Sequence, residues 1–103
     1  MKNAVWFISY KLKKEKSEEE FLAASEILGR EYISRQKGYI SWKQLKEGDT
    51  WVDLATWECM EDAKNFEKSG GGGERASKFY SFIDFKTLKS TFYTVEKAYK
   101  FEV

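Results

Sequence analysis

Apolar and polar side chains alternate along three stretches of the chain, and each stretch predicts a β-strand. In residues 5–12 large apolar groups occupy both parities, so we expect a central strand that is covered on both faces. Residues 39–46 and 51–57 also alternate, and the Glu-Gly-Asp sequence at 47–49 between them is typical of a turn. These two strands are therefore predicted to form a hairpin.

Helical spacing of apolar residues follows a capping box at Ser17, whose hydroxyl can accept a hydrogen bond from the Glu20 amide. This helix should run to about residue 34 and end before Gly38, which supplies a permissive backbone. A second helix is expected to open at residues 58–62 and to be broken by the four glycines at 70–73. Residues 74–83 are predicted to hold a further short helix.

The C-terminal segment 92–103 predicts the last strand, because its aromatic and aliphatic residues share one parity. The element order is then strand, helix, strand, strand, helix, strand. This order predicts an α+β, ferredoxin-like βαββαβ domain over residues 1–103, with an antiparallel sheet and helices on one face. Since so short a chain has nothing left to cover the other face, we expect a homodimer.

Composition and charge argue against several classes of binding partner. The sequence is 42% hydrophobic and 17% aromatic, which is more aromatic surface than so small a domain can bury, so some rings should line a pocket or an interface. The formal net charge is +1 with mixed signs, which argues against a nucleic-acid partner. No apolar stretch approaches the ~20 residues of a membrane span, so we expect no membrane partner and a cytoplasmic protein.

Metal and cofactor chemistry has few candidate ligands in this sequence. Histidine is absent and Cys59 is the single cysteine, which rules out a zinc site, a Cys–His nucleophile and an internal disulfide. The glycines at 70–73 lack the spacing and the Lys-Ser/Thr pair of a phosphate-binding loop. We therefore expect no metal and no cofactor.

Two short motifs resemble a known family: Gly-Tyr-Ile-Ser-Trp at 38–42 and Thr-Trp-Glu-Cys-Met-Glu-Asp-Ala at 56–63. In them the chain resembles the dimeric α/β-barrel superfamily, in particular its antibiotic-biosynthesis-monooxygenase-like branch. Members often begin the second strand with glycine, an aromatic and an aliphatic residue, and end the third strand with tryptophan before an acidic helix start. The resemblance covers nearly the whole chain in element order and implies a dimeric α/β barrel.

The resemblance also implies a range of activities. The superfamily includes cofactor-free monooxygenases that act on polycyclic aromatic substrates, haem-degrading enzymes and small proteins without assigned activity. The haem-degrading members need an axial histidine and an asparagine in the first strand. This chain has no histidine, and its first strand reads Trp-Phe-Ile-Ser-Tyr at 6–10, so haem ligation of that type is excluded. The cofactor-free monooxygenases remain as the activity implied.

A candidate site follows from strand parity. If the first and third strands are neighbours, one sheet face collects four aromatic rings, one aliphatic side chain and one carboxylate. With two rings from the later helices they would form an aromatic pocket for a flat ligand, or else a plain core. The candidate catalytic residues are Asp53 and Tyr10, and the candidate substrate-binding residues are Trp6, Ile8, Trp51, Trp57, Phe66 and Phe79.

Asp53 is the most informative residue, because a carboxylate in the middle of an apolar strand is costly to bury. In an apolar pocket its pKa would rise, which suits a general base that deprotonates a phenol-like substrate. The alternative is that Asp53 faces solvent or pairs with a lysine of the second strand, such as Lys43.

Two further features have alternative interpretations. Cys59 stands where a helix N-cap is expected, either as a reactive thiol or as a weak cap. The glycines at 70–73 are either a mobile lid over a pocket mouth or a passive flexible connection, such as an engineered replacement of a native loop.

These observations lead to two hypotheses about function. The first is a small-molecule-binding protein, by resemblance a cofactor-independent monooxygenase acting on an aromatic substrate between sheet and helices. The second is a non-catalytic structural or binding homodimer.

Overall fold

The computed structural model describes residues 1–102 and contains a four-stranded sheet. Its strands are β1 (Ala4–Leu12), β2 (Tyr39–Glu47), β3 (Thr50–Trp57) and β4 (Ile83–Thr94). They lie in the order β2-β3-β1-β4, and every neighbouring pair is antiparallel. The hairpin of β2 and β3 and the central place of β1 are therefore as predicted.

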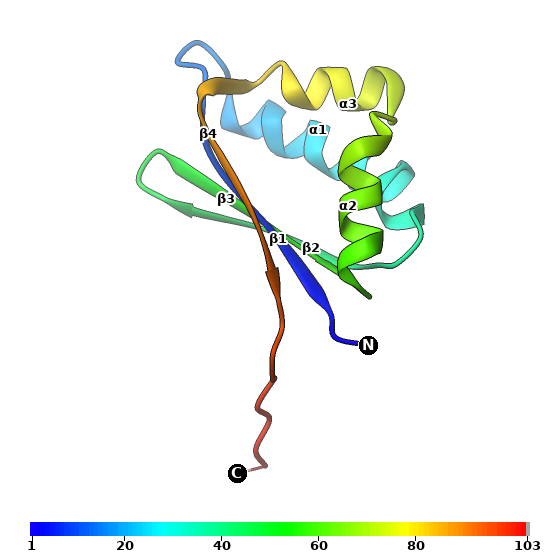
Figure 1. Cartoon of the computed structure of the whole chain (residues 1–103). Coiled ribbons are helices and arrows are strands. Elements are labelled where there is room, and N and C mark those ends of the chain that lie inside the picture. The colour runs from blue at the N-terminus through cyan, green and yellow to red at the C-terminus, as the bar shows by residue number, and fades with distance from the viewer. Residues whose placement is uncertain (103) are drawn as a thin grey trace.

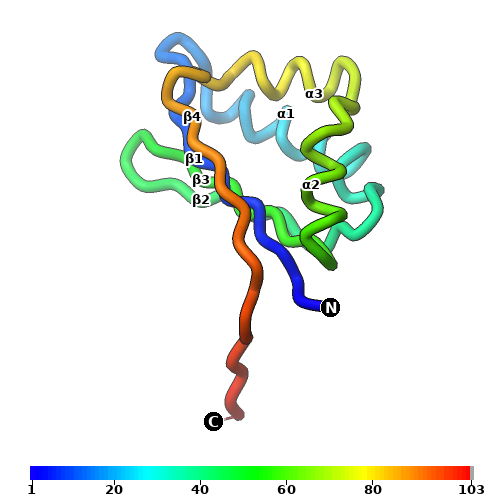
Figure 2. The backbone as a smooth tube through the Cα atoms, in the orientation of Figure 1, coloured from blue at the N-terminus to red at the C-terminus, as the bar shows by residue number. Residues whose placement is uncertain are grey.

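Three α-helices cover one face of this sheet, while the other face carries no helix (Figure 1). They are α1 (Glu18–Glu31), α2 (Met60–Ser69) and α3 (Gly73–Tyr80), and a 3-10 turn, Ile33–Arg35, follows α1. The backbone tube shows α1 and α3 running side by side, with α2 across the end of the layer (Figure 2). The expected ferredoxin-like α+β architecture is confirmed.

Local sequence explains where the helices begin and end. The Ser17 hydroxyl accepts a hydrogen bond from the Glu20 amide at 3.2 Å, which satisfies one of the free donors at the start of α1. Gly70 ends α2 in the left-handed conformation with φ of 62°. Cys59 occupies the N-cap of α2 as expected, but its side chain makes no capping hydrogen bond.

The last strand differs from the prediction. β4 begins at Ile83, directly after α3, and ends at Thr94, whereas residues 95–102 are not strand. These residues extend away from the body of the molecule (Figure 1), and Tyr99 and Phe101 are exposed. Their shared parity does not make a strand because, within residues 1–102, their backbone pairs with no neighbouring strand beyond the bond from the Val95 amide to the Asn3 carbonyl. Val103 lies outside the described residues.

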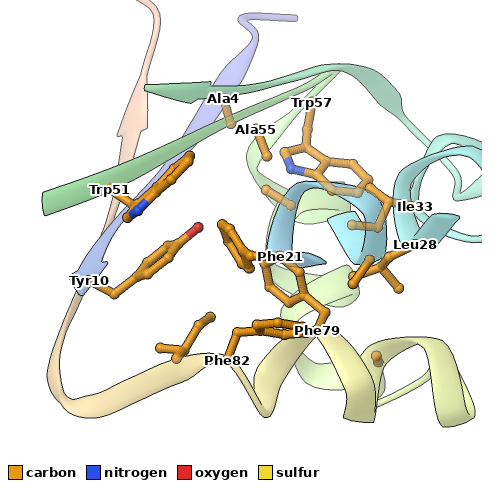
Figure 3. Packing of buried hydrophobic residues seen from close by; sticks show 14 residues of the cluster. Ala4, Tyr10, Phe21, Leu28, Ile33, Trp51, Ala55, Trp57, Phe79 and Phe82 are labelled. Carbon is orange, nitrogen blue, oxygen red and sulfur yellow. The ribbon is translucent and has the colours of Figure 1, made fainter. Parts of the chain in front are cut away.

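The core lies between the sheet and the helices. Phe21 on α1 is fully buried and packs against rings from the sheet and from α3, with ring centroids 5.1 Å from Trp51 and 5.3 Å from Phe79. Figure 3 shows these rings together with Tyr10, whose hydroxyl is directed into the interior. Burying aromatic rings of this size supplies much of the stability of a small domain.

The second face of the sheet carries apolar side chains beside polar ones such as Lys43 and is uncovered within the described chain, so the expected cover of β1 on this face would have to come from a second subunit. Positions of β3 alternate between buried and half-buried, so Val52 and Leu54 lie on the face that has no helices. Phe7 of β1 lies on the same face and meets Tyr93 of β4 edge to face at 6.3 Å. Among the described residues no helix is long and apolar enough to cross a membrane.

Candidate functional site

A cavity of about 410 Å³ opens between the sheet and the helices. Strands β1, β2, β3 and β4 and helices α1, α2 and α3 all contribute to its wall, which is largely aromatic and aliphatic. Its lining residues are Trp6, Ile8, Tyr10, Leu28, Tyr32, Ile33, Trp42, Asp53, Ala55, Phe66, Glu67, Gly71, Ala76, Phe79, Tyr80, Ile83, Phe85, Leu88 and Ser90. An apolar cavity of this size with few polar groups is typical of a small-molecule site.

Asp53 and Tyr10 form a buried polar pair in this wall. Antiparallel pairing places Asp53 opposite Ile8 and Trp51 opposite Tyr10, so both polar side chains project from the helix-covered face. The Tyr10 hydroxyl donates a hydrogen bond of 2.8 Å to Oδ1 of Asp53. Asp53 is only 4% exposed and Tyr10 only 1% exposed, so this bond is sheltered from bulk water.

Burial determines the protonation of this pair. Loss of hydration raises the pKa of Asp53 to about 7, although interactions with the side chains of Tyr10, Trp42 and Gln44 lower it in part. Burial, followed by the nearby charge of Asp53, raises the pKa of the Tyr10 hydroxyl well above its usual range. Near neutral pH the carboxyl therefore exchanges a proton readily while Tyr10 remains a hydrogen-bond donor.

Trp6 of β1 forms a fixed wall of the cavity. Its indole N–H donates a hydrogen bond of 2.7 Å to the Ser90 hydroxyl of β4. The ring stacks on Phe92 with 5.3 Å between centroids and meets Phe66 of α2 edge to face at 6.2 Å. These contacts fix the orientation of the indole in the cavity wall.

The mouth of the cavity lies between α2 and α3. A second hollow of about 430 Å³ adjoins the first there and shares Trp6, Tyr32, Phe66, Glu67 and Tyr80 with it. Burial, with a smaller contribution from the Asp53 charge, raises the pKa of Tyr80. The two hollows therefore lie side by side, with the buried pair in the wall of the inner one.

The candidate residues divide into two groups. The cavity wall contains Trp6, Ile8, Tyr10, Asp53, Phe66 and Phe79, whose roles toward a substrate remain predictions. Trp51 and Trp57, expected as further walls, do not line it, and Figure 3 shows them at opposite ends of the core. Trp51 packs against Phe21 and Trp57 against Phe66 at 4.8 Å, so other side chains already occupy the space beside both rings.

The alternative placements of Asp53 are both wrong. The side chain does not face solvent, since it is 4% exposed. It does not pair with Lys43, because Lys43 stands opposite Leu54 and so lies on the helix-free face. The residue of β2 that stands opposite Asp53 is Gln44.

Several cavity residues escaped the sequence analysis. Trp42 shares the parity of Gln44 in β2, so its position on the cavity face was available from the sequence alternation. Phe85 and Leu88 belong to the part of β4 that no pattern predicted, and Glu67 and Tyr80 lie on helices whose orientation the sequence does not determine.

Cys59 lies away from the site, whereas the glycine segment lies beside it. Cys59 is not in the lining of either hollow. Gly71 lines both, and its neighbours Gly70 and Gly73 line the outer one, so the glycine segment is at the mouth. Within residues 1–102 no group of three His, Cys, Asp or Glu side chains is arranged to hold a metal ion.

Comparison with solved structures finds this architecture in several proteins. The cofactor-independent oxygenase SnoaB from Streptomyces nogalater matches with 15% identity and a TM-score of 0.76, covering 95% of this chain and 97% of that chain. A monooxygenase from the gene ActVA-Orf6 of Streptomyces coelicolor, in complex with Nanaomycin D, matches with 17% identity, a TM-score of 0.74 and coverage of 98% and 94%. The chain has the fold of the antibiotic-biosynthesis-monooxygenase-like proteins.

That fold is shared with an enzyme of another reaction class. Hydroxynitrile lyase from Passiflora edulis matches with 15% identity, a TM-score of 0.66 and coverage of 95% and 97%. No family model and no curated protein matches the sequence. The monooxygenase-like fold confirms the resemblance seen in the motifs. A shared fold does not by itself assign an activity to this chain.

Proposed function

We propose that the cavity binds a flat aromatic molecule and that the protein oxidises it with dioxygen, without a cofactor. The observation that carries the proposal is the buried Asp53–Tyr10 pair in the wall of an aromatic cavity. A ring-shaped ligand would stack on the indole and phenyl faces of the wall and leave its acidic group against the carboxylate. Solved oxygenases with the same fold support this reading.

The reaction balances without an external reductant. Removal of a proton from an activated CH₂ group between aromatic rings leaves a carbanion, which transfers electrons to dioxygen. One oxygen atom then becomes the carbonyl oxygen of the product, and the other leaves as water with the two hydrogen atoms of the CH₂ group. The protein contributes a base, a shaped apolar space and exclusion of bulk water.

Asp53 is suited to the role of the base. A pKa of about 7 leaves the carboxylate ionised in about half of the molecules at neutral pH, and it makes Asp53 a stronger base than an exposed aspartate. Tyr10, with its raised pKa, keeps its proton and orients Oδ1. Turnover should therefore increase as the pH rises through about 7.

The test is oxygen uptake with anthrone-type and phenol-type substrates. Asp53→Asn should lower kcat by a factor of about 10² to 10⁴, the usual contribution of a general base, and should remove the rise of turnover with pH. Asp62→Asn is the matched control, because Asp62 is also a buried aspartate but does not line the cavity. Full turnover by folded Asp53→Asn would refute the base role.

The alternative is a binding protein without catalysis. It predicts that the same aromatic molecules bind in the cavity but that oxygen uptake does not exceed the rate in buffer. The fold occurs in enzymes of different reaction classes, so binding and turnover must be measured separately.

We further propose that the protein is a homodimer joined through the helix-free face of the sheet. That face carries Phe7, Val52, Leu54 and Tyr93 without cover from the described chain. Contiguous apolar surface of this kind on a small protein marks an interaction site.

A further inference from the structure

The outer hollow at the cavity mouth is walled by four aromatic side chains from three elements. Trp6 comes from β1, Phe66 from α2 and Tyr80 from α3, while Tyr32 follows α1 directly. The rings of Trp6 and Phe66 stand at 71° and those of Tyr32 and Phe66 at 40°, so they enclose the space from several directions. The face of an aromatic ring carries the negative side of its quadrupole and attracts cations, so an aromatic wall of this kind suits a positively charged group.

All of the charged side chains that line the two hollows are acidic. Asp53 lies in the inner wall, Glu67 lines both hollows, and Glu74 lines the outer one. No lysine or arginine is in either lining, although the sequence contains 18 of them against 17 acidic residues. The negative lining is therefore a local feature and does not follow from the charge of the chain.

The two glutamates have no partner of opposite charge. Within the described part of the chain neither Glu67 nor Glu74 forms an ion pair. Two neighbouring basic groups make other contacts: Arg75 pairs with Glu31 at 2.6 Å, and the Lys64 ammonium lies 5.8 Å from the Phe92 ring centre. Lys68 and Lys78 also belong to α2 and α3, but neither is in the lining of the two hollows. Neither carboxylate is taken up by an ion pair, so both are available to a cationic group of a ligand.

We propose that the outer hollow is an ammonium subsite, so that the aromatic ligand of this protein carries a protonated amine and not a carboxylate. Its flat ring would occupy the inner cavity beside Asp53, and its ammonium group would lie among the four rings at the mouth, near Glu67 and Glu74. An anionic ligand would place like charges together in a space with no basic side chain to compensate. This inference rests on the proposed binding role of the cavity.

The test compares three naphthalene probes of equal shape and different charge: the aminomethyl, hydroxymethyl and carboxylate derivatives. Isothermal titration calorimetry at pH 8 should give a dissociation constant for the amine about three- to tenfold lower than for the alcohol, from cation–π attraction and a partly exposed ion pair. The carboxylate should bind more weakly than the alcohol. Added salt should reduce the preference for the amine.

The double variant Glu67→Gln/Glu74→Gln should bind the amine and the alcohol with similar dissociation constants, and so lose most of the preference for the amine. Glu61→Gln is the control, because Glu61 is an exposed residue of α2 outside both linings. The inference is overturned if the alcohol binds the wild type as tightly as the amine, or if the double variant keeps the full preference. Failure of all three probes to bind would instead overturn the binding role of the cavity, and the inference with it.

Discussion

Asp53 is the buried carboxylate on which the proposed catalysis depends. Burying a carboxylate costs free energy unless its hydrogen bonds are replaced, and the Tyr10 hydroxyl replaces one of them. The part of this desolvation free energy that hydrogen bonds do not offset raises the pKa of Asp53. A residue that lowers the stability of the folded state in this way is typical of functional sites.

This cost should be measurable as a dependence of stability on pH. Because the pKa of Asp53 rises from 3.8 to about 7 on folding, the folded protein binds more protons than the unfolded chain between these values. The contribution of Asp53 to the free energy of unfolding therefore falls as the pH rises through this window. At about 1.4 kcal/mol per pKa unit the loss could reach about 4 kcal/mol.

Urea unfolding of the wild type and Asp53→Asn at pH 5 and pH 8.5 checks this expectation. The variant should be more stable than the wild type by a small margin at pH 5 and by a larger one at pH 8.5, because the cost of the buried Asp53 grows from pH 3.8 to about 7 while asparagine stays neutral. Contributions that both proteins share, such as that of Glu31, whose pKa the Arg75 guanidinium lowers, cancel in the difference. A difference that is the same at both pH values would show that Asp53 titrates normally.

Among the elements, the segments with clear periodicity were predictable and β4 was not. Helix α1 and strands β1, β2 and β3 show a capping box or regular alternation, and the structure contains each of them. In β4 the pairing with β1 shifts between Ser9 and Lys11, and Lys89 and Asp84 are their partners. This irregularity breaks the alternation in residues 84–88, so no pattern revealed the strand.

The candidate site, like the fold, could be predicted only as far as the alternation within each single strand reveals it. Asp53 and Tyr10 could be named because each strand shows its own parity, but their hydrogen bond depends on the register between two strands. Trp51 and Trp57 share the parity of Asp53, yet packing at the two ends of β3 places them in the core. Parity identifies the face of a sheet, while the position along the strand decides between cavity and core.

The glycine segment between α2 and α3 makes close contact with the site. A Cβ atom added at Gly71 would overlap the Tyr32 hydroxyl oxygen. Gly71→Ala must therefore displace Tyr32 or the segment, and it should lower the free energy of unfolding by about 1–3 kcal/mol. Chemical denaturation measures this loss.

Gly70→Asn is the control for that substitution. Gly70 has φ of 62°, a conformation that asparagine tolerates, and a Cβ atom there would meet no atom within 4 Å. We expect this variant to lose less stability than Gly71→Ala. Equal losses would indicate that backbone freedom, and not the contact with Tyr32, is what the segment requires.

For the molecule as a whole, the uncovered face of the sheet predicts the oligomeric state. Leu54 is half-buried at the centre of that face, with Phe7 of β1 opposite it. Leu54→Lys should shift the proposed homodimer toward monomer, because a charge at the centre of an apolar interface must be desolvated. Sedimentation at micromolar concentration measures the shift.

Leu22→Lys is the matched control, since Leu22 is an exposed leucine of α1 on the helix side of the molecule. It should leave the oligomeric state unchanged. A wild-type protein that sediments as a monomer under these conditions would refute the proposed dimer.

The alternation of β3 has an evolutionary consequence. Its odd-numbered positions face the helices and its even-numbered positions face outward, so a point mutation in this strand alters either the core and cavity side or the outer surface. The proposed ligand preference and the proposed self-association can then diverge separately within one lineage, even though eight consecutive residues contribute to both. A single-residue insertion within the strand would exchange the two sets of side chains, so we expect changes in β3 among descendants to be substitutions and seldom insertions or deletions.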